Sequence, residues 1–359
     1  VKLNGLSQNA ACTVNVTLKK IGLTSKSKNY VRSQQFEVTR TVGISTNGSL
    51  TTDSGLTNNL GYGTRVEDQE ISLNVPDVSK IIAIYESKNT SKPVFDKLTF
   101  VSGLNLDTNA VIGEKIIGQE SRAVGQIVER TSTTISFVYL NANKFTLGEQ
   151  VKFKESAIST ILQEITNGNY IDRTGNYNLN KGHTRQFLDY SRIERKAKSG
   201  IPARRLLIVF DKYEIPAGNK GDVCSINSYT ADRYQNDIPN VIGNRLTDIL
   251  DFRPRVKEFG SGTNGSPFSF HNREFEETNK FVITPDESSI LGYSFYLPRI
   301  DKLVINQFEQ VKLIRGESAE VPVPPTEVGN SMEVAQITLP PYLYDVVKQP
   351  SIRMFDNRR

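Results

Sequence analysis

The sequence predicts a mainly β protein, with several β-sandwich or small β-barrel domains in series and a few short helices. Three observations lead to this prediction. Aliphatic and aromatic residues come in short runs, Gly, Asn, Asp, Ser and Thr separate these runs, and one pattern near the middle of the chain is repeated. The 359 residues suffice for two or three domains, and the composition is that of an ordinary globular protein.

Residues 1–105 are predicted to form an N-terminal β-domain. The stretches "CTVNVTLKKI" (12–21) and "EISLNVPDVSKIIAIYES" (70–87) have alternating or continuous apolar character, whereas residues 43–64 are rich in turn formers. Within the second stretch, Ile81 to Tyr85 is the best candidate for a central strand.

Residues 106–166 contain the repeat and are predicted to form a small β-barrel-like module. "VIGEKIIGQESRAVGQIVE" (111–129) and "TLGEQVKFKESAISTILQE" (146–164) share a Gly-Glu, an apolar residue two positions later and a Glu-Ser six positions after the first Glu. Each Gly-Glu is interpreted as a turn between strands. The repeated glutamates could alternatively face one another as the carboxylates of a glycan hydrolase. A repeated polar strand face gives the same spacing, so a structural role is favoured for Glu114, Glu120, Glu149 and Glu155.

Residues 167–359 are predicted to form a C-terminal β-rich domain, entered through an Asn- and Gly-rich connector at 167–180. Its run Leu206–Phe210 is continuously apolar, as expected of a strand that is covered on both faces. A second strand is predicted at Val223–Tyr229, antiparallel to the first. One short helix is predicted over residues 240–254, where Asn240 could cap the start and Pro254 ends the pattern.

The region from residue 291 onward is predicted to continue as strands. The candidates are Leu291–Leu297, Lys302–Ile305 and Val311–Ile314. "EVPVPP" (320–325) should be an extended, stiff segment, because Pro fixes its own backbone and restricts the residue before it.

The positive charge of the chain is concentrated in one stretch. The formal net charge is +5, and residues 181–205 carry eight Lys or Arg against two acids. One interpretation is a solvated strand edge, because cations there discourage unwanted pairing. A second is a protein contact, since Arg forms planar, multi-donor bonds to carboxylates at interfaces. The candidate partner-binding residues are Arg185, Arg192, Arg195, Lys196, Lys198, Arg204 and Arg205.

Nucleic-acid binding is the least favoured use of this basic stretch. Nucleic-acid binders combine such charge with a reading helix, zinc fingers, or aromatic rings placed between the cations. Here Phe187 and Tyr190 precede most of the cations.

Residues that carry catalysis, metals or cofactors are scarce in this chain. His183 and His271 are the two histidines, and both are expected at the solvated surface. "GSGTNG" (260–265) matches a dinucleotide-binding pattern but lacks a strand before it and a helix after it. Cys12 and Cys224 lie far apart, so buried free thiols are favoured over a disulfide. We therefore predict no enzyme activity, no cofactor and no metal site.

No membrane span is expected either. The longest strongly apolar run, Leu206–Phe210, is far shorter than a bilayer-crossing helix requires.

Five stretches of the second half of the chain carry a family resemblance. They read "DYSRIERKAKSGIPARRLLIVFDKYE", "LTDILDFRPRV", "YSFYLPRIDKLVI", "LIRGESAEVPVPP" and "ITLPPYLYDV". In this order they resemble the large virion structural proteins of contractile-tailed phages, especially phages that infect cyanobacteria. The match is closest from about Phe187 to Tyr344, and residues 70–87 and the Gly-Glu repeats are similar in style.

The resemblance implies a structural protein of a phage tail, in the baseplate or in tail-fibre attachment. Such a protein is assembled in the host cytoplasm and located in the virion tail. Its partners would be other tail or baseplate proteins and further copies of itself, with a trimer plausible. The family supplies no catalytic motif to carry over. The alternative is a receptor-binding module that recognises host surface glycan, for which Tyr and Asn side chains of 167–180 could stack on sugars and hydrogen-bond them.

Overall fold

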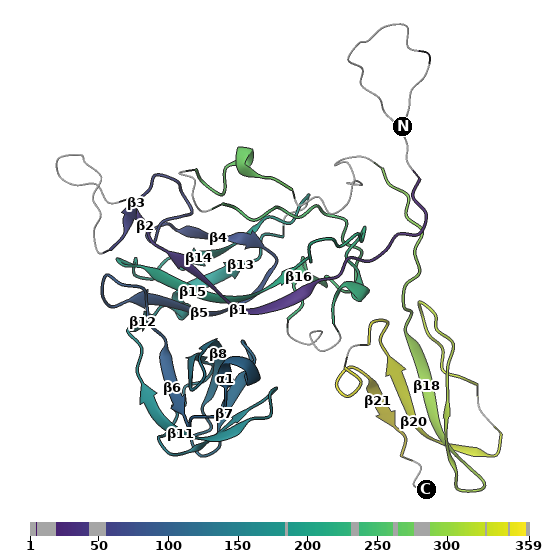
Figure 1. Ribbon diagram of the computed structural model, residues 1–359. Coiled ribbons are helices and arrows are strands. Elements are labelled where there is room, and N and C mark those ends of the chain that lie inside the picture. The colour runs from purple at the N-terminus through teal and green to yellow at the C-terminus, as the bar shows by residue number, and fades with distance from the viewer. Residues whose placement is uncertain are drawn as a thin grey trace.

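The computed structural model describes residues 5, 19–42, 55–183, 186–230, 237–260, 265–275, 288–326, 329–343 and 345–356. Figure 1 shows three β-rich units: a body of two sheets, a small barrel beside it, and a separate C-terminal sheet. The prediction of a mainly β chain with a small barrel and few helical turns is therefore confirmed. The predicted strand at 12–21 and the turn-rich stretch at 43–64 lie largely outside the described residues, as does most of 260–265.

The body is a sandwich of two antiparallel sheets. The first has the order β1 (Asn29–Val38), β15 (Leu206–Glu214), β5 (Val78–Ser87) and β12 (Tyr170–Asp172). The second has the order β13 (Tyr177–Asn180), β14 (Tyr190–Arg195) and β4 (Glu70–Pro76). Side chains from both sheets form one apolar core between them, as expected for face-to-face packing.

Strand β15 is buried on both faces, as its continuous apolar run predicts. Leu206, Ile208 and Phe210 point into the core of the sandwich. Leu207 and Val209 point to the opposite face, where they belong to a cluster that includes barrel residues. The predicted central strand at 81–85 is also confirmed, because β5 pairs with both β15 and β12.

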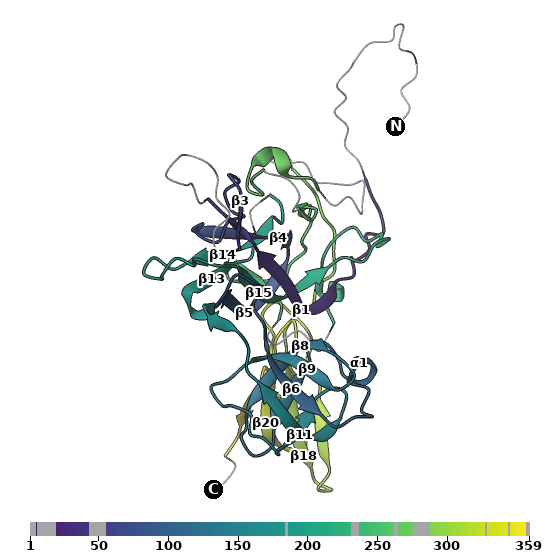
Figure 2. The ribbon, with the colours of Figure 1, turned by 60° about the vertical axis from the view of Figure 1, so that its left-hand side comes forward.

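The barrel is inserted in the sequence between β5 and β12 of the body, and Figure 2 shows it below β1, β5 and β15. Its closed order is β10 (Gln150–Phe153), β11 (Ser159–Thr166), β6 (Asp96–Phe100), β9 (Thr134–Tyr139), β8 (Val124–Arg130) and β7 (Lys115–Gly118), and α1 (Leu106–Asn109) lies in the β6–β7 connection. Each Gly-Glu marks a turn, as predicted, and both glycines have positive φ, 81° at Gly113 and 83° at Gly148. Closure leaves the six strands without an unpaired edge.

The structure divides the chain differently from the predicted boundaries at 105 and 166. Strand β6 precedes residue 106 but belongs to the barrel. Strand β15, from the predicted third domain, lies between β1 and β5 of the predicted first domain. Boundaries drawn along the sequence miss this arrangement because strands pair across long sequence separations.

Three predicted elements of the third region are wrong. Residues 240–254 form no helix, because β16 (Asn240–Val241) and β17 (Asn244–Arg245) form a hairpin whose two turn residues, 242 and 243, have positive φ. Residues 223–229 contain isolated bridges and the 3₁₀ turn η2 (Ile226–Ser228), and β15 pairs with β1 and β5 instead. Residues 291–297 form no strand.

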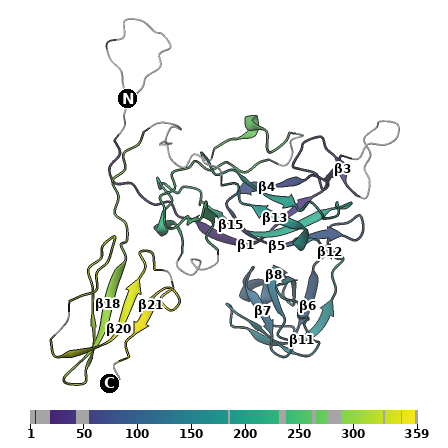
Figure 3. The same cartoon turned by 180° about the vertical axis from the view of Figure 1, so that it is seen from behind.

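The C-terminal unit is a four-stranded antiparallel sheet in the order β19 (Val311–Ile314), β18 (Arg299–Asn306), β20 (Ser331–Leu339) and β21 (Ser351–Met354). The predicted strands at 302–305 and 311–314 are thus confirmed. Figure 3 shows this sheet on the opposite side of the body from β12, well separated from the barrel. The remaining short elements are the parallel pair β2 (Arg40–Thr41) and β3 (Thr57–Asn58), and the 3₁₀ turns η1 (Thr174–Asn176) and η4 (Phe270–Asn272).

Candidate assembly surface

Two arginines of the basic stretch, Arg192 and Arg195, lie on β14 and contact their own neighbours. The Arg192 Nε atom lies 3.4 Å from a carboxylate oxygen of Glu70 and 3.5 Å from one of Glu194. Arg195 donates a hydrogen bond from Nη2 to the carbonyl oxygen of Glu67 at 3.2 Å. Both side chains are partly buried, so much of their bonding capacity serves the sheet itself.

Arg204 and Arg205, which lead into β15, make similar internal contacts. Arg204 donates from Nη1 to the carbonyl oxygen of Lys88. Arg205 donates from Nη2 to the carbonyl oxygen of Gly55 at 2.9 Å, and its Nη1 lies 3.2 Å from Oε1 of Glu37. These two cations hold connections of the body in place.

The two lysines of the predicted site are exposed. Lys196 donates from Nζ to the carbonyl oxygen of Gly175 at 2.7 Å, and Lys198 lies in the turn that follows β14. Arg185 lies outside the described residues. Partner binding by this stretch stays a prediction, and Lys196 and Lys198 are its most accessible cations among the described members.

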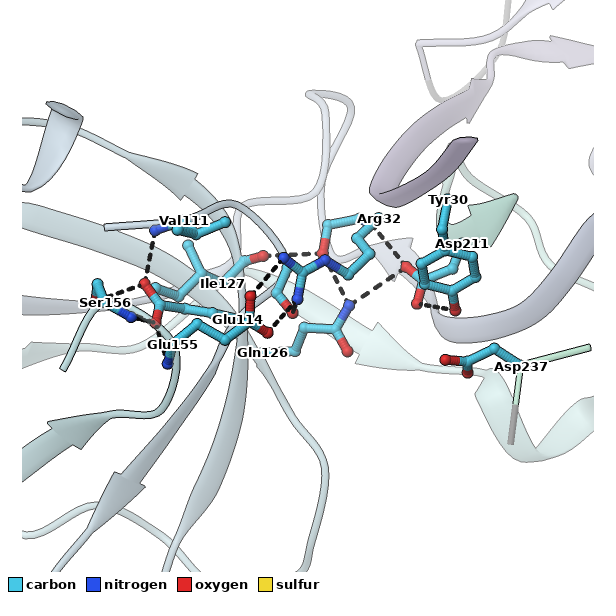
Figure 4. A network of polar contacts seen from close by, with 12 residues as sticks. Tyr30, Arg32, Val111, Glu114, Gln126, Ile127, Glu155, Ser156, Asp211 and Asp237 are labelled. Carbon is cyan, nitrogen blue, oxygen red and sulfur yellow. Dashed lines mark hydrogen bonds and ion pairs between the residues drawn. The ribbon is translucent and has the colours of Figure 1, made fainter. Parts of the chain in front are cut away.

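The repeated glutamates of the barrel bind backbone groups of the opposite repeat. Glu114 Oε2 accepts hydrogen bonds from the backbone N–H groups of Glu155 and Ser156, both at 3.0 Å, and the Ser156 hydroxyl completes the contact (Figure 4). Its Oε1 accepts from the N–H of Val111 at 2.6 Å.

Glu149 of the second repeat makes the equivalent contacts with the Glu-Ser segment of the first repeat. Its Oε2 accepts from the N–H groups of Glu120 and Ser121 at 3.2 and 3.0 Å, and its Oε1 accepts from the N–H of Thr146 at 2.7 Å. Burial tends to raise the pKa of Glu149, but these bonds, led by that from Ser121, lower the pKa below its usual value. Glu114 and Glu149 are thus reciprocal turn clamps. The Glu-Ser of each repeat is the segment that the other repeat holds.

The barrel is joined to the body by polar contacts from β1 to β8 and to the turn between β10 and β11. Arg32 forms a two-pronged ion pair with Glu155, with Nη2 lying 2.9 Å from Oε2 (Figure 4). Beside it, the Ser33 hydroxyl donates to the carbonyl oxygen of Ile127 at 2.9 Å. The buried Asp211 carboxylate accepts from the N–H of Ser33 at 2.8 Å. With the apolar cluster beside it, this contact fixes the barrel against the body.

His183 is partly buried, which corrects the expectation of a solvated histidine, whereas His271 is exposed as expected. Arg253 donates to His183 Nδ1 at 3.1 Å, so the neutral ring carries its proton on Nε2. Burial lowers the pKa of His183 to about 4, and the positive charges of Arg253 and Lys28 act in the same direction, against the carboxylate of Asp77.

Lys28 and Asp77 form a fully buried ion pair near this histidine, with Nζ 2.6 Å from Oδ2. Burial alone would lower the pKa of Lys28, but the Asp77 carboxylate raises it well above its usual range. The pair lies where the chain passes from β4 to β5. Its place between the two sheets indicates a structural role.

The Asn- and Tyr-rich stretch proposed for sugar stacking has its rings turned inward. Tyr170 stacks on Tyr85 with ring centroids 3.8 Å apart, and its hydroxyl donates to Asp96. Tyr177 belongs to the core of the sandwich.

The C-terminal sheet has one apolar face that nothing in the described chain covers fully. Alternate residues of a strand share a face, and so do residues paired across strands. The register therefore places on this face Val311, Leu313, Leu303, Ile305, Met332, Ala335, Ile337, Leu339, Ile352 and Met354. The opposite face is mainly polar and carries the Lys302–Glu333 ion pair.

Much of this apolar face is open to solvent. At the edges and on β20, the exposed fractions are 61% for Val311, 49% for Met332, 60% for Ile352 and 67% for Met354. Ala335, at the centre, is buried. Contiguous exposed apolar patches of this kind mark protein contacts in soluble proteins. We name this set of ten residues the open face.

Sequence reasoning found two of the four strands but missed the open face. The signal was present, because "VKLI", "SMEVAQITL" and "SIRM" each place apolar residues at alternate positions. Alternation does not show which strands share a sheet or whether a second layer covers it.

Comparison with family models, curated proteins and solved structures gives no match. Among the described residues, no helix is long and apolar enough to span a membrane. Within the same residues, no cluster of His, Cys, Asp or Glu is arranged to hold a metal ion.

Proposed function

We propose that this chain is a structural protein of a phage virion tail, in the baseplate or in tail-fibre attachment, and that it acts by protein assembly without catalysis. The open face carries this proposal. A sheet that is apolar on one side needs a second layer, and the remainder of the described chain covers this face only in part.

Two further observations support assembly. Glu114 and Glu149 are saturated by backbone donors, which gives them turn-holding roles in place of the facing geometry that glycan hydrolysis requires. The five stretches of the second half resemble tail proteins, and the first of them includes β14 and β15 of the body.

The test is to locate the chain in purified contractile-tailed particles. We expect stoichiometric amounts of it in the virion by mass spectrometry, and labelling of the tail or baseplate by antibodies against the C-terminal sheet. Intact, infectious particles formed by a phage that lacks the gene would refute the proposal.

Host glycan recognition receives less support. A sugar-binding surface presents aromatic faces to solvent, and both Tyr170 and Tyr177 are directed inward. A glycan array probed with the purified chain checks this, and binding to host envelope sugars would favour the alternative.

A further inference from the structure

Residues 290–297, "ILGYSFYL", form a second apolar element, which leads into β18. Within the described parts of the chain, no backbone hydrogen bond is made to this segment, although its pattern predicts a strand. Its side chains are open to solvent: Ile290 is fully exposed, and Tyr293, Phe295 and Tyr296 are 60, 50 and 60% exposed. We name residues 290–297 the free segment.

The free segment alternates between larger and smaller side chains over most of its length. Leu291, Tyr293, Phe295 and Leu297 would lie on one side of an extended chain, with Gly292, Ser294 and the two larger residues Ile290 and Tyr296 on the other. It instead forms one wall of a wide hollow of about 1210 Å³ against residues 20–25 and 247–252 of the body. The body therefore leaves most of its aromatic surface uncovered.

The free segment is poorly placed to cover the open face of its own chain. It passes into β18 through Leu297 and Pro298, and Pro holds the residue before it in an extended conformation. The chain consequently leaves the end of the sheet and runs toward the body (Figures 1 and 3). In a second copy of the chain, the same segment is not connected to the sheet that it would cover, so the direction in which it leaves its own β18 does not prevent the contact.

We infer that the free segment of one copy of this chain lies on the open face of a second copy, and that the exchange is reciprocal or continues around a closed ring. Each copy carries both an unpaired apolar strand sequence and an apolar face without a covering layer. A second copy therefore supplies a covering segment for the open face and an apolar surface for the free segment. This inference rests on the proposed assembly function and names its partner.

The dimensions of the two surfaces agree. Eight extended residues span about 26 Å, and four strands side by side measure about 19 Å across, so the segment can cross the whole face. Aromatic side chains offer about 150 to 250 Å² each, so the two half-exposed rings that share a side, Tyr293 and Phe295, supply roughly 200 Å². This is about a quarter of the ~800 Å² that each partner buries in a standard interface.

Charge also permits the contact. The charged residues that the register places on this face are Arg299 and Asp301, which pair with each other at 3.2 Å. The free segment has no charged side chain. Two copies can thus approach without like-charge repulsion and without burying an unpaired ion.

The test is sedimentation velocity of the purified full chain and of matched variants, up to about 100 µM, where an interface with a micromolar Kd is mostly associated. We expect the wild type to sediment as a dimer or small ring. Ile352→Lys puts a charge on the open face and should weaken association at least about 100-fold. The control Ser351→Lys adds the same charge one residue earlier, on the opposite face, and should associate like the wild type.

A mixing experiment identifies the free segment as the occupant. Tyr293→Ser combined with Phe295→Ser should be monomeric with an intact open face, whereas Ile352→Lys keeps an intact free segment. Mixed together, they can form one intact half-interface, so we expect a heterodimer that neither variant forms alone. Far-UV circular dichroism of each variant verifies that it is folded.

A wild-type chain that stays monomeric at about 100 µM, where even weak micromolar contacts form, overturns the inference. So does equal loss of association in the Ser351→Lys control, or a mixture that stays monomeric. These outcomes are separable from the tail assignment. A monomeric chain that is still found in virions leaves the tail role standing, whereas an associating chain absent from virions refutes the tail role alone.

Discussion

The barrel and the C-terminal sheet are both built from short antiparallel strands, yet they treat their apolar residues differently. The barrel closes on itself and has an interior of fully buried side chains such as Leu98, Phe137 and Phe153. Among the described residues, the C-terminal sheet keeps two unpaired edges and leaves Ile352 and Met354 mostly exposed. The comparison indicates that the barrel buries its apolar residues through its own contacts, whereas the sheet leaves part of its apolar face exposed within the described chain.

The polar groups of the two regions differ in the same way. In the barrel, Glu114 and Glu149 saturate the turn N–H groups of the opposite repeat, so that each repeat fixes the other. In the C-terminal sheet, β21 pairs with β20 alone, and all four of its residues are exposed. A free strand edge with apolar neighbours is a template for pairing with another chain.

The largest expected effect is a loss of core packing in the barrel. Phe137→Ala removes a fully buried ring that contacts Tyr139 and Phe145, and should lower the free energy of unfolding by about 3 to 5 kcal/mol. Ile352→Ala in the C-terminal sheet should cost the isolated chain less than about 1 kcal/mol, because the side chain is mostly solvated. Chemical denaturation followed by circular dichroism measures both. Equal losses would mean that the two regions do not differ as described.

A smaller effect is expected for the turn clamp. Glu149→Gln replaces two accepting oxygens by one oxygen and an NH₂ group that faces backbone donors, and should cost about 2 to 3 kcal/mol. The pKa of Glu149 is lower in the folded chain than in the unfolded chain. Its stabilisation is therefore present above the unfolded pKa and is lost as the pH falls through the folded value.

Thermal melts of the wild type and of Glu149→Gln between neutral pH and about pH 3 give the comparison, since an ordinary Glu titrates near 4.3. The difference in melting temperature should shrink as the pH falls. A constant difference would contradict a stabilising role for the charged carboxylate. Glu120→Gln is the matched control. The side chain of Glu120 is exposed, and Glu149 accepts a hydrogen bond from the backbone N–H of Glu120, which the substitution leaves in place.

The smallest effect is expected in the basic stretch. Lys198→Glu lies at an exposed turn and should change stability by no more than about 0.5 kcal/mol. Arg195→Glu places a carboxylate against the carbonyl oxygen of Glu67 and should be the more destabilising of the two.

If Lys196 and Lys198 contact a neighbouring tail protein, replacing both with Glu should lower incorporation into particles while the chain stays folded. Normal incorporation would exclude these two lysines as the contact.

Local patterns of the sequence determined the strand-rich class, the doubly buried β15 and the Gly-Glu turns. Each of these depends on neighbouring residues: a continuous apolar run requires two covered faces, and a glycine accepts the positive φ that a tight turn requires. The predicted helix at 240–254 was also inferred from a local pattern, and it was wrong. The apolar spacing there resembles that of a helix, but residues 242 and 243 form a tight turn with positive φ.

Tertiary structure alone decided which strands share a sheet. It placed β15 between β1 and β5, set Glu114 against the turn at Ser156, and committed Arg192 and Arg205 to carboxylates of the body. Among the described residues, it also left 290–297 without strand pairing and one face of β18–β21 partly exposed. The physical reason is that strand pairing and ion pairing join residues that are far apart in sequence. Alternation of apolar and polar residues along a strand shows that one face is apolar, but it does not show which part of the structure covers that face.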